Sequence, residues 1–423
     1  METRLWHPFA NMAQVRGGEL VLERGEDVWV WDDQGNRYLD ACASLWYANV
    51  GHGRREIEQA VSAQMTKLES YAIYGDLANE TANELAARLA ALSPFDDARV
   101  YFGLGGADAI DTAAKLARLY WSQTDSPGRV HLIGRTRAYH GSHGIGTSIG
   151  GIPVNASGFG PLVGETSIVD WNSPDALAAE IDAVGAEHVA AFFIEPVIGA
   201  GGVYPPPDGY VEAVAEICER NGILLIVDSV ICGFGRLGTW FGIERWDVSP
   251  DMIVFAKGVT SGYLPLGGVV VSGRVSEPFW SGDGAIFRHG QTYSGHPTCC
   301  AAALANLDIL ERERLVPRGR ELEQPLLDAL RPAESSPAVA EVRGGTGFLA
   351  AVELSPELLR ERPAAVSELT LEARRRGVIV RPLASGIAVS PPLTADESHL
   401  RLLADAVAEG VAALEAAAGS TVP

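Results

Sequence analysis

The residues best suited to chemistry stand at the ends of two predicted strands. Lys257, one of only three lysines in the chain, follows the apolar run Met252–Ala256 and precedes a glycine-rich loop. Burial at a strand end withdraws a lysine from water and lowers its pKa, so a neutral, nucleophilic amine is available near neutral pH. A structural lysine whose stem covers apolar surface while its amine reaches solvent fits the same pattern. Position alone leaves both interpretations open.

A carboxylate occupies the equivalent place on another predicted strand. Asp228 ends the most apolar run of the chain, residues 223–227. A carboxylate at that depth needs a cationic or hydrogen-bonding partner, although an aspartate that caps a turn has the same signature. Ligands gather where the carboxyl ends of parallel strands meet. An acid and a lysine that both end strands of one sheet therefore predict a binding site.

Two glycine-rich stretches add binding groups. Residues 103–108 read Gly-Leu-Gly-Gly-Ala-Asp before a predicted helix, whose N-terminus would offer N–H groups to a phosphate. The stretch matches neither Walker A nor GxGxxG, and an ordinary tight turn is the alternative. Residues 139–144, Tyr-His-Gly-Ser-His-Gly, supply a ring that can stack on a cofactor. Their two histidines have no acidic third ligand nearby, so we predict no metal site.

Together these features describe a site for pyridoxal 5′-phosphate. The helix N-terminus would hold the phosphate, the aromatic ring would stack on the pyridine ring, and the lysine would bond to the aldehyde. The carboxylate would keep the pyridine nitrogen protonated, so that the ring acts as an electron sink for a carbanion at the substrate's α-carbon. Each feature alone is weak, whereas the combination is far more specific.

Composition limits the partners and the compartment. The 423-residue chain has a formal net charge of −21 and 47% hydrophobic residues. This charge argues against nucleic acid and anionic membranes as partners, because little in the chain would replace phosphate counterions. Five cysteines without a CxxC pattern predict neither disulfides nor a zinc site and favour the cytoplasm. We find no signal-peptide pattern and no apolar run of membrane-spanning length.

Short apolar runs alternate with helical patterns between about residues 100 and 271, which predicts an α/β fold. The central sheet should be mostly parallel, with helices on both faces. We expect an N-terminal segment, residues 1–60, that joins a small α+β domain at residues 316–423, and a large cofactor-binding domain at residues 61–315. The predicted strands of the large domain are Val100–Phe102, Val130–Ile133, Val189–Ile194, Ile223–Asp228, Met252–Ala256 and Gly267–Val271.

Seven motifs follow one another along nearly the whole chain: Leu5–Phe9, Tyr139–Gly141, Phe193–Val197, Asp228–Arg236, Phe255–Gly258, Gly290–Pro297 and Val380–Pro382. In their order and spacing, the chain resembles the class III aminotransferases. These pyridoxal-phosphate enzymes include ω-amino acid and amine:pyruvate transaminases and adenosylmethionine-8-amino-7-oxononanoate transaminase. The resemblance implies a fold-type I architecture and a homodimer with shared active sites.

The resemblance also implies a role for each matching residue. Lys257 would bond the cofactor and shuttle a proton, and Asp228 would partner the pyridine nitrogen. Arg381 would bind a substrate carboxylate and swing away for uncharged amines, unless it is simply a solvated arginine. The other implied cofactor-binding residues are Gly106, Ala107, Tyr139, His140, Glu195, Val230 and Thr292, of which Thr292 would reach the phosphate in the neighbouring subunit.

Trp46 lies in an aromatic, glycine-rich stretch, residues 41–53. Its indole is either part of the core or the wall of an apolar pocket. We take it as a candidate substrate-binding residue, together with Arg381.

The chain departs from the family pattern at three places. The phosphate loop reads Gly105-Gly-Ala-Asp-Ala109 in place of Ser-Gly-Ser-Glu-Ala, which shifts phosphate binding toward backbone N–H groups. Ser229 stands where the family usually has a glutamate, a change that would alter the field around the cofactor. Ala200 stands where some members keep a glutamate that pairs with the arginine, which should leave Arg381 free.

The sequence therefore predicts a pyridoxal-phosphate-dependent aminotransferase. Its donor would be an amine or amino acid, its acceptor a keto acid, aldehyde or ketone, and its mechanism ping-pong. The substitutions at Ala107 and Ser229 keep open a member repurposed for elimination, replacement or carbon–carbon bond formation on an α-amino acid such as S-adenosylmethionine. A non-enzymatic binding protein with a relict cofactor pocket is the other alternative.

Overall fold

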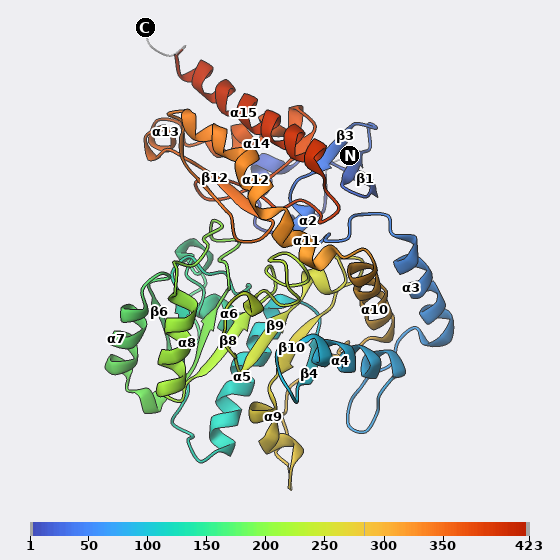
Figure 1. Cartoon of the computed structure of the whole chain (residues 1–423), viewed down its shortest axis with the longest axis vertical. Helices are drawn as coiled ribbons and strands as arrows, with labels where there is room; N and C mark the ends of the chain where they lie inside the picture. Colours follow the sequence, from blue (N-terminus) through green and yellow to red (C-terminus); the bar gives the residue numbers. More distant parts are fainter. Residues whose placement is uncertain (1–2, 283, 420–423) are drawn as a thin grey trace.

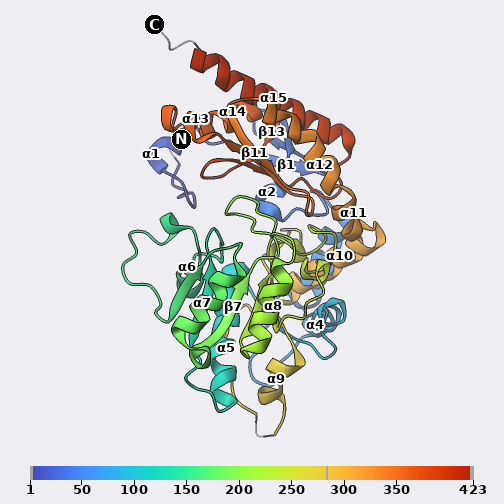
Figure 2. The same ribbon diagram turned by 60° about the vertical axis from the view of Figure 1, so that its left-hand side comes forward.

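The computed structural model describes residues 3–282 and 284–419 of the chain. Figure 1 shows two parts stacked along the long axis, a larger α/β part and a smaller part that contains both the N-terminal strands and the C-terminal helices. The rotated view in Figure 2 shows the same division, with helix α15 (Glu397–Gly419) lying across the outer face of the smaller part.

A seven-stranded sheet forms the centre of the larger part. Its strands lie in the order β4-β10-β9-β8-β7-β5-β6, and β10 alone runs antiparallel to its neighbours within this sheet. The prediction of a mostly parallel sheet is confirmed. The strands are β4 (Arg99–Gly103), β5 (His131–Arg135), β6 (Thr166–Val169), β7 (Val189–Ile194), β8 (Leu224–Asp228), β9 (Met252–Phe255) and β10 (Gly267–Val271).

The central strands are apolar on both faces because helices cover both. Ile226 and Val254 pack in the cluster that contains helix α5, whereas Leu225 and Val227 pack in the cluster that contains α8. This alternation explains the continuous apolar runs of the sequence. Strand β6 is absent from the prediction because it lies at the sheet edge, where three of its four residues are not buried and the run is not continuously apolar.

Helices α5 and α9 pack on one face of this sheet, and α7 and α8 pack on the other. Helices α3 and α4 both pack against α10 beside it (Figure 1). Within the described ranges, no helix is both long and apolar enough to cross a membrane. The helices of this part are α3 (Arg55–Leu68), α4 (Glu80–Leu92), α5 (Gly106–Gln123), α6 (Gly144–Ser148), α7 (Pro174–Val184), α8 (Tyr210–Arg220), α9 (Gly273–Trp280) and α10 (Pro297–Arg312), with short 3-10 turns η1 (Pro153–Asn155), η2 (Ala186–His188), η3 (Ile243–Arg245) and η4 (Lys257–Val259).

The smaller part contains two four-stranded sheets. One is antiparallel, in the order β11-β12-β15-β14, and the other joins β1, β2 and β3 to β13. The parallel pairing of β3 with β13 supports the proposal that the N-terminal segment belongs with the C-terminal domain. The strands are β1 (Leu22–Glu26), β2 (Trp29–Asp32), β3 (Arg37–Asp40), β11 (Val339–Arg343), β12 (Ala350–Leu354), β13 (Val378–Ile379), β14 (Arg381–Pro382) and β15 (Gly386–Val389). The helices are α1 (Met12–Val15), α2 (Ala43–Trp46), α11 (Leu315–Glu321), α12 (Glu323–Leu330), η5 (Arg331–Ser335), α13 (Pro356–Glu361), α14 (Ala365–Arg375) and α15.

A fully buried arginine joins the two parts. The Arg236 guanidinium donates to the carbonyls of Phe348 (2.9 Å) and Pro391 (2.7 Å) and to Asn49 Oδ1 (2.8 Å). Burial lowers the pKa of Arg236 to about 9. Hydrogen bonds to the N-terminal segment and to the small part thus hold the Arg236 guanidinium in one orientation.

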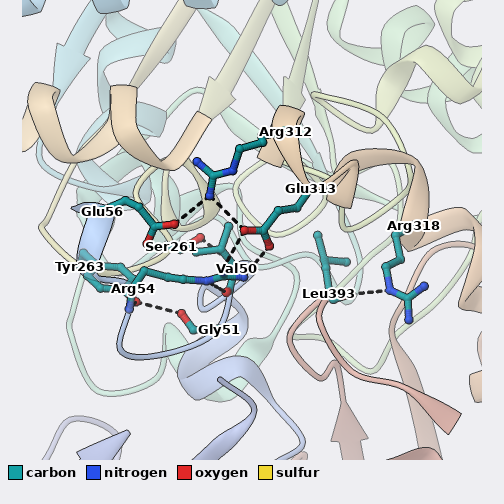
Figure 3. Close-up of polar contacts among 10 residues, drawn as sticks. All are labelled: Val50, Gly51, Arg54, Glu56, Ser261, Tyr263, Arg312, Glu313, Arg318 and Leu393. Atoms are coloured by element: carbon teal, nitrogen blue, oxygen red, sulfur yellow. Dashed lines mark hydrogen bonds and ion pairs between the residues drawn. The ribbon is translucent and has the colours of Figure 1, made fainter. Parts of the chain in front are cut away.

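A second polar junction lies nearby (Figure 3). Arg54 pairs with both carboxylate oxygens of Glu313, at 2.9 and 2.8 Å. The Tyr263 hydroxyl accepts the Arg54 N–H at 2.6 Å and donates to the Gly51 carbonyl at 3.1 Å. Ser261 Oγ accepts the Val50 N–H at 3.3 Å. These contacts fix the loop after η4 to the N-terminal segment and to the end of α10.

Candidate active site

A cavity of about 430 Å³ opens at the carboxyl ends of the central strands. Asp228, which ends β8, and Lys257, which follows β9, both line it. This is the edge at which α/β sheets bind ligands. The structure therefore brings together the acid and the lysine that the sequence places at strand ends. Further lining comes from Gly105–Ala107, Tyr139–Gly141 and Leu264–Leu266.

Lys257 begins the turn η4 with a left-handed φ of 48°. Burial lowers the pKa of its amine to about 8, and the charges of Asp228 and Glu195 oppose this shift. An amine with this pKa is partly neutral near pH 7, and the neutral form is the nucleophile. The pKa of the Lys257 amine is thus lowered, as its burial after a strand predicts.

Asp228 is buried and held by two donors. His140 Nδ1 lies 2.8 Å from Asp228 Oδ2, and the Val230 N–H donates to Asp228 Oδ1 at 3.0 Å. A carboxylate can only accept, so His140 donates through Nδ1. His140 Nε2 is buried without a hydrogen-bond partner among the described residues. His140 therefore lines the cavity and contacts the carboxylate, which restricts the orientation of Asp228.

Glu195 is buried and holds the loop that carries Tyr139. Its Oε1 accepts the Tyr139 N–H at 3.0 Å, and its Oε2 accepts the Gly199 N–H at 2.9 Å. Burial raises the pKa of Glu195, and the nearby His140 lowers it. Both carboxylate oxygens are thus engaged with backbone, although the side chain also lines the cavity.

The first turn of α5 points into the cavity and has no capping side chain. Gly105 is its N-cap residue, and the Asp108 carboxylate accepts the Leu104 N–H at 2.8 Å. Close packing explains two of the glycines: a Cβ on Gly106 would lie 3.0 Å from Val230, and one on Gly141 would lie 2.6 Å from the Ala107 Cβ. An uncapped helix N-terminus lined by small residues is a site for an anion.

Tyr139 and Val230 both line the cavity, as the sequence predicts. The ring of Phe9 also packs edge-on against Tyr139, with 6.4 Å between centroids. Although Phe9 belongs to the motif Leu5–Phe9, an aromatic residue near the N-terminus does not by itself indicate which residue it contacts. The N-terminal segment thus reaches the edge of the site.

The sequence predicts that Trp46 is a substrate-binding residue, but it is not among the residues that line the cavity. It is 3% exposed and packs in an apolar cluster with Val197 and Ile231. Its neighbours Leu45 and Tyr47 line the cavity instead. The reason is the backbone, since Ala43, Ser44 and Trp46 all adopt positive φ and turn the indole away from the cavity.

Ser229 also points away from the cavity. Its hydroxyl donates to the Phe241 carbonyl at 2.6 Å and is fully buried. The serine hydroxyl therefore anchors the 229–241 loop, and the expectation that a missing carboxylate at this position alters the field around the cofactor stays a prediction. Thr292 is exposed and does not line the cavity of its own chain.

Arg381 lies on β14 near the site. Its charge acts on both Lys257 and Tyr139. Among residues 3–282 and 284–419, no carboxylate forms an ion pair with it. Ala200 packs against the apolar cluster that contains Trp46. The guanidinium is thus available to a ligand, as the alanine at position 200 predicts.

Pyridoxal 5′-phosphate fits these groups. The uncapped first turn of α5 would bind its phosphate, and the Lys257 amine, whose pKa is lowered, would react with its aldehyde. The carboxylate of Asp228 would contact its pyridine nitrogen. A mostly parallel sheet with these groups at its carboxyl edge defines a pyridoxal-phosphate enzyme of fold type I.

Comparison with known proteins narrows the class. The family model for class-III aminotransferases matches residues 12–411, so the chain belongs to that family. The putrescine–pyruvate aminotransferase of Pseudomonas aeruginosa is 39% identical over 416 residues, which span 93% of this chain and 91% of that protein. The (S)-enantioselective ω-transaminase from Thermomicrobium roseum superposes with a TM-score of 0.91, at 42% identity and 96% coverage of both chains. An amine transaminase from an uncultivated Pseudomonas species, solved with pyridoxal phosphate bound, gives 0.93 at 37% identity and covers 98% of this chain and 99% of that one.

The protein is therefore a pyridoxal-phosphate-dependent aminotransferase, and the predicted family, fold type, cofactor and reaction are confirmed. Membership of the class-III aminotransferase family favours transamination over elimination, replacement and carbon–carbon bond formation. It also favours an enzyme over a binding protein with a relict cofactor pocket. The lining residues that sequence reasoning missed, Leu45 and Leu264–Leu266, are apolar wall residues. In a sequence they are indistinguishable from core.

Proposed function

We propose that this aminotransferase takes its amino group from an amine or ω-amino acid and passes it to a keto acid such as pyruvate, in a ping-pong order. The observation that carries the proposal is the Arg381 guanidinium near a largely apolar cavity, because no carboxylate of the described residues forms an ion pair with it. Leu45 and Leu264 offer apolar contact to a donor chain, while Arg381 offers a bidentate partner to an acceptor carboxylate. The names of the relatives, putrescine–pyruvate aminotransferase and ω-transaminase, support the same substrate classes.

In this proposal, each group of the chain has one task. The bound cofactor supplies an electron sink for the negative charge that develops at the donor carbon. Lys257 would take the proton from that donor carbon and deliver it to C4′, the cofactor carbon that carries the aldehyde, and its lowered pKa suits both the uptake and the release of the proton. Asp228 keeps the pyridine nitrogen protonated, and His140 holds the carboxylate in place. The N–H groups of Gly106 and Ala107 bind the phosphate.

Replacement of Arg381 by alanine tests the substrate assignment. We expect the KM for pyruvate to rise about 10–100-fold, because the variant loses a charge-assisted bidentate contact. Transfer from an uncharged amine to an uncharged aldehyde should change less than about 3-fold, since neither substrate presents a carboxylate. Steady-state kinetics with the two substrate pairs measure both effects.

Arg375→Ala is the matched control, because it removes an exposed arginine from the neighbouring helix α14. It should leave both substrate pairs unchanged. Equal losses for both pairs in Arg381→Ala would remove the proposed role of Arg381. Failure of the wild-type enzyme to transaminate any amine or ω-amino acid with pyruvate would remove the substrate assignment itself.

We also propose a homodimer in which Thr292 contacts the phosphate bound in the partner subunit. Thr292 is exposed, and the neighbouring Gly290 and Ser294 line a surface cavity of about 720 Å³ with Tyr74 and Ile286. Tyr74 and Ile286 are 51% and 66% exposed. Large apolar side chains at such exposure fit a surface that a second copy covers.

Mixed dimers test this arrangement. Thr292→Ala should weaken pyridoxal phosphate binding about 10-fold, and Lys257→Ala should not bond the cofactor covalently. In a dimer of one chain of each kind, a shared site would combine the intact Lys257 of one subunit with the intact Thr292 of the other. One of the two sites of each mixed dimer should therefore bind the cofactor covalently with wild-type affinity, which is about a quarter of all sites in an equimolar co-refolded mixture. If Thr292 serves its own chain, mixing restores nothing.

We also propose that the protein is cytoplasmic. All five cysteines are free and buried. Burial raises the pKa of Cys42, Cys218 and Cys232, which keeps these thiols protonated and unreactive. Such thiols suit a reducing compartment.

A further inference from the structure

The turn that carries Lys257 is conformationally strained. Lys257 and Ser261 both have φ of 48°, in the left-handed region that non-glycine residues rarely adopt. Such residues keep this conformation only where their surroundings hold it, and they concentrate at functional sites. Something must therefore hold the backbone of residues 257–261.

Asn306 supplies two of the contacts that do so. It lies on helix α10, which packs against η4, and it is fully buried. Its amide nitrogen donates to the carbonyl oxygens of Gly258 and Val259, both at 2.9 Å. The amide has two hydrogens, so its donors are fully used on the carbonyls of the two residues that follow Lys257.

The acceptor side of the same amide is unpaired. Asn306 Oδ1 is buried without a hydrogen-bond partner among the described residues. A buried acceptor without a partner costs free energy, and an apolar residue of similar size would avoid that cost. The two donated bonds are therefore what the asparagine contributes at this position.

Other contacts confine the turn but do not replace Asn306. Thr260 Oγ1 donates to the Leu264 carbonyl at 2.6 Å, and Ser261 Oγ accepts the Val50 N–H, as Figure 3 shows. A Cβ on Gly258 would lie 2.6 Å from Asn49 Nδ2. These contacts act on the side chains of Thr260 and Ser261 and on the Cα of Gly258, whereas Asn306 holds the backbone carbonyls of the two residues that follow Lys257.

We propose that Asn306 is a positioning residue for Lys257, which keeps the strained turn in place so that the amine points into the cavity. The inference rests on the proposed role of Lys257 as the residue that bonds the cofactor. Without the two donated bonds, the backbone at Lys257 relaxes toward ordinary dihedral angles, and the amine leaves the cavity that Asp228 also lines. The phosphate site at the start of α5 does not depend on this turn.

The binding of two ligands distinguishes a positioning role of Asn306 from general damage to the fold. Pyridoxal phosphate must bond to Lys257, whereas pyridoxamine phosphate has no aldehyde and binds without that bond. In Asn306→Leu, covalent capture of pyridoxal phosphate by the cofactor-free protein should slow at least about 10-fold, the loss of one to two net hydrogen bonds. The dissociation constant of pyridoxamine phosphate should change less than about 3-fold. Absorption spectroscopy follows the first quantity, and calorimetry measures the second.

Asn306→Asp is the second variant, because it keeps the shape of the side chain but replaces the donor nitrogen by an oxygen. It should slow capture at least as much as Asn306→Leu. Asn221→Leu is the matched control, since it removes an amide that donates to the Ile217 carbonyl at 2.9 Å at the end of α8. That control should change neither ligand.

Each remaining outcome decides the proposal. Wild-type capture rates in both Asn306 variants overturn it, and so does a parallel loss of capture and of pyridoxamine phosphate affinity. If neither variant folds, Asn306 serves stability alone and the proposal fails. Covalent capture by Lys257→Ala would instead overturn the role of Lys257, which keeps the two failures distinguishable.

Discussion

Lys257→Ala is expected to lose transaminase activity by about 10³-fold or more, because it removes both the covalent attachment and the group that moves the proton. The visible absorption of the lysine-bound cofactor should disappear from the purified protein. Pyridoxamine phosphate should still bind, since the start of α5 and the carboxylate of Asp228 remain. Kinetics, absorption spectra and calorimetry on one preparation measure the three effects.

The other two lysines of the chain provide the controls. Lys67 pairs with Glu80 on the surface, and Lys115 contacts His289 Nδ1 at 2.9 Å. Alanine at either position should leave the spectrum and the rate unchanged. A lysine-bound spectrum that survives in Lys257→Ala would assign the attachment to one of these two residues and remove Lys257 from the site.

The pH dependence of covalent capture follows from the same lysine. Only the neutral amine attacks the aldehyde, so capture by the cofactor-free enzyme should accelerate as pH rises. The midpoint should lie near pH 8, because burial lowers the pKa of Lys257 to about 8 from its usual 10.5. A rate that still rises steeply near pH 10 would show that the amine is fully solvated.

Strand ends were predictable because continuous apolar runs mark strands buried on both faces. Asp228 and Lys257 interrupt such runs with charge, and the edge of a parallel sheet brings their ends together. The contact between His140 and Asp228 joins residues 88 positions apart. It depends on how the loop after β5 returns over β8, which no local pattern records.

Side-chain direction in irregular segments was not predictable. Trp46 faces the core because three of the residues at positions 43–46 adopt positive φ without being glycine. No turn residue marks that conformation in the sequence, so the aromatic pattern assigns the cavity wall to the wrong neighbour. Asn306 is hidden for a related reason, since a single amide in an apolar helix gives no sign of the carbonyls 47 and 48 positions away.

Removal of the Asp228 charge is the second large effect. We expect Asp228→Asn to slow transamination by about 10²–10³-fold, because loss of one partner from a buried charge pair leaves the other unstabilised. The pyridine nitrogen would then lose its proton, and the ring would withdraw electrons less well. The shape of the side chain is kept, so the affinity for pyridoxamine phosphate should fall less than the rate. Stopped-flow kinetics of the donor half-reaction measure the rate directly.

Two comparisons show whether the charge itself is responsible. A pyridoxal phosphate analogue methylated at the pyridine nitrogen keeps its positive charge without a carboxylate, so it should recover part of the rate in Asp228→Ala, which leaves room for the methyl group. Asp251→Asn is the matched control, because Asp251 pairs with Arg274 and accepts the Leu225 N–H at 2.9 Å at the opposite end of the same strands. That variant should lower the free energy of unfolding and leave the half-reaction unchanged. Two results would mean that the Asp228 carboxylate acts through folding and not through the cofactor nitrogen. One is a slower donor half-reaction in Asp251→Asn, and the other is a half-reaction in Asp228→Ala that the methylated analogue does not accelerate.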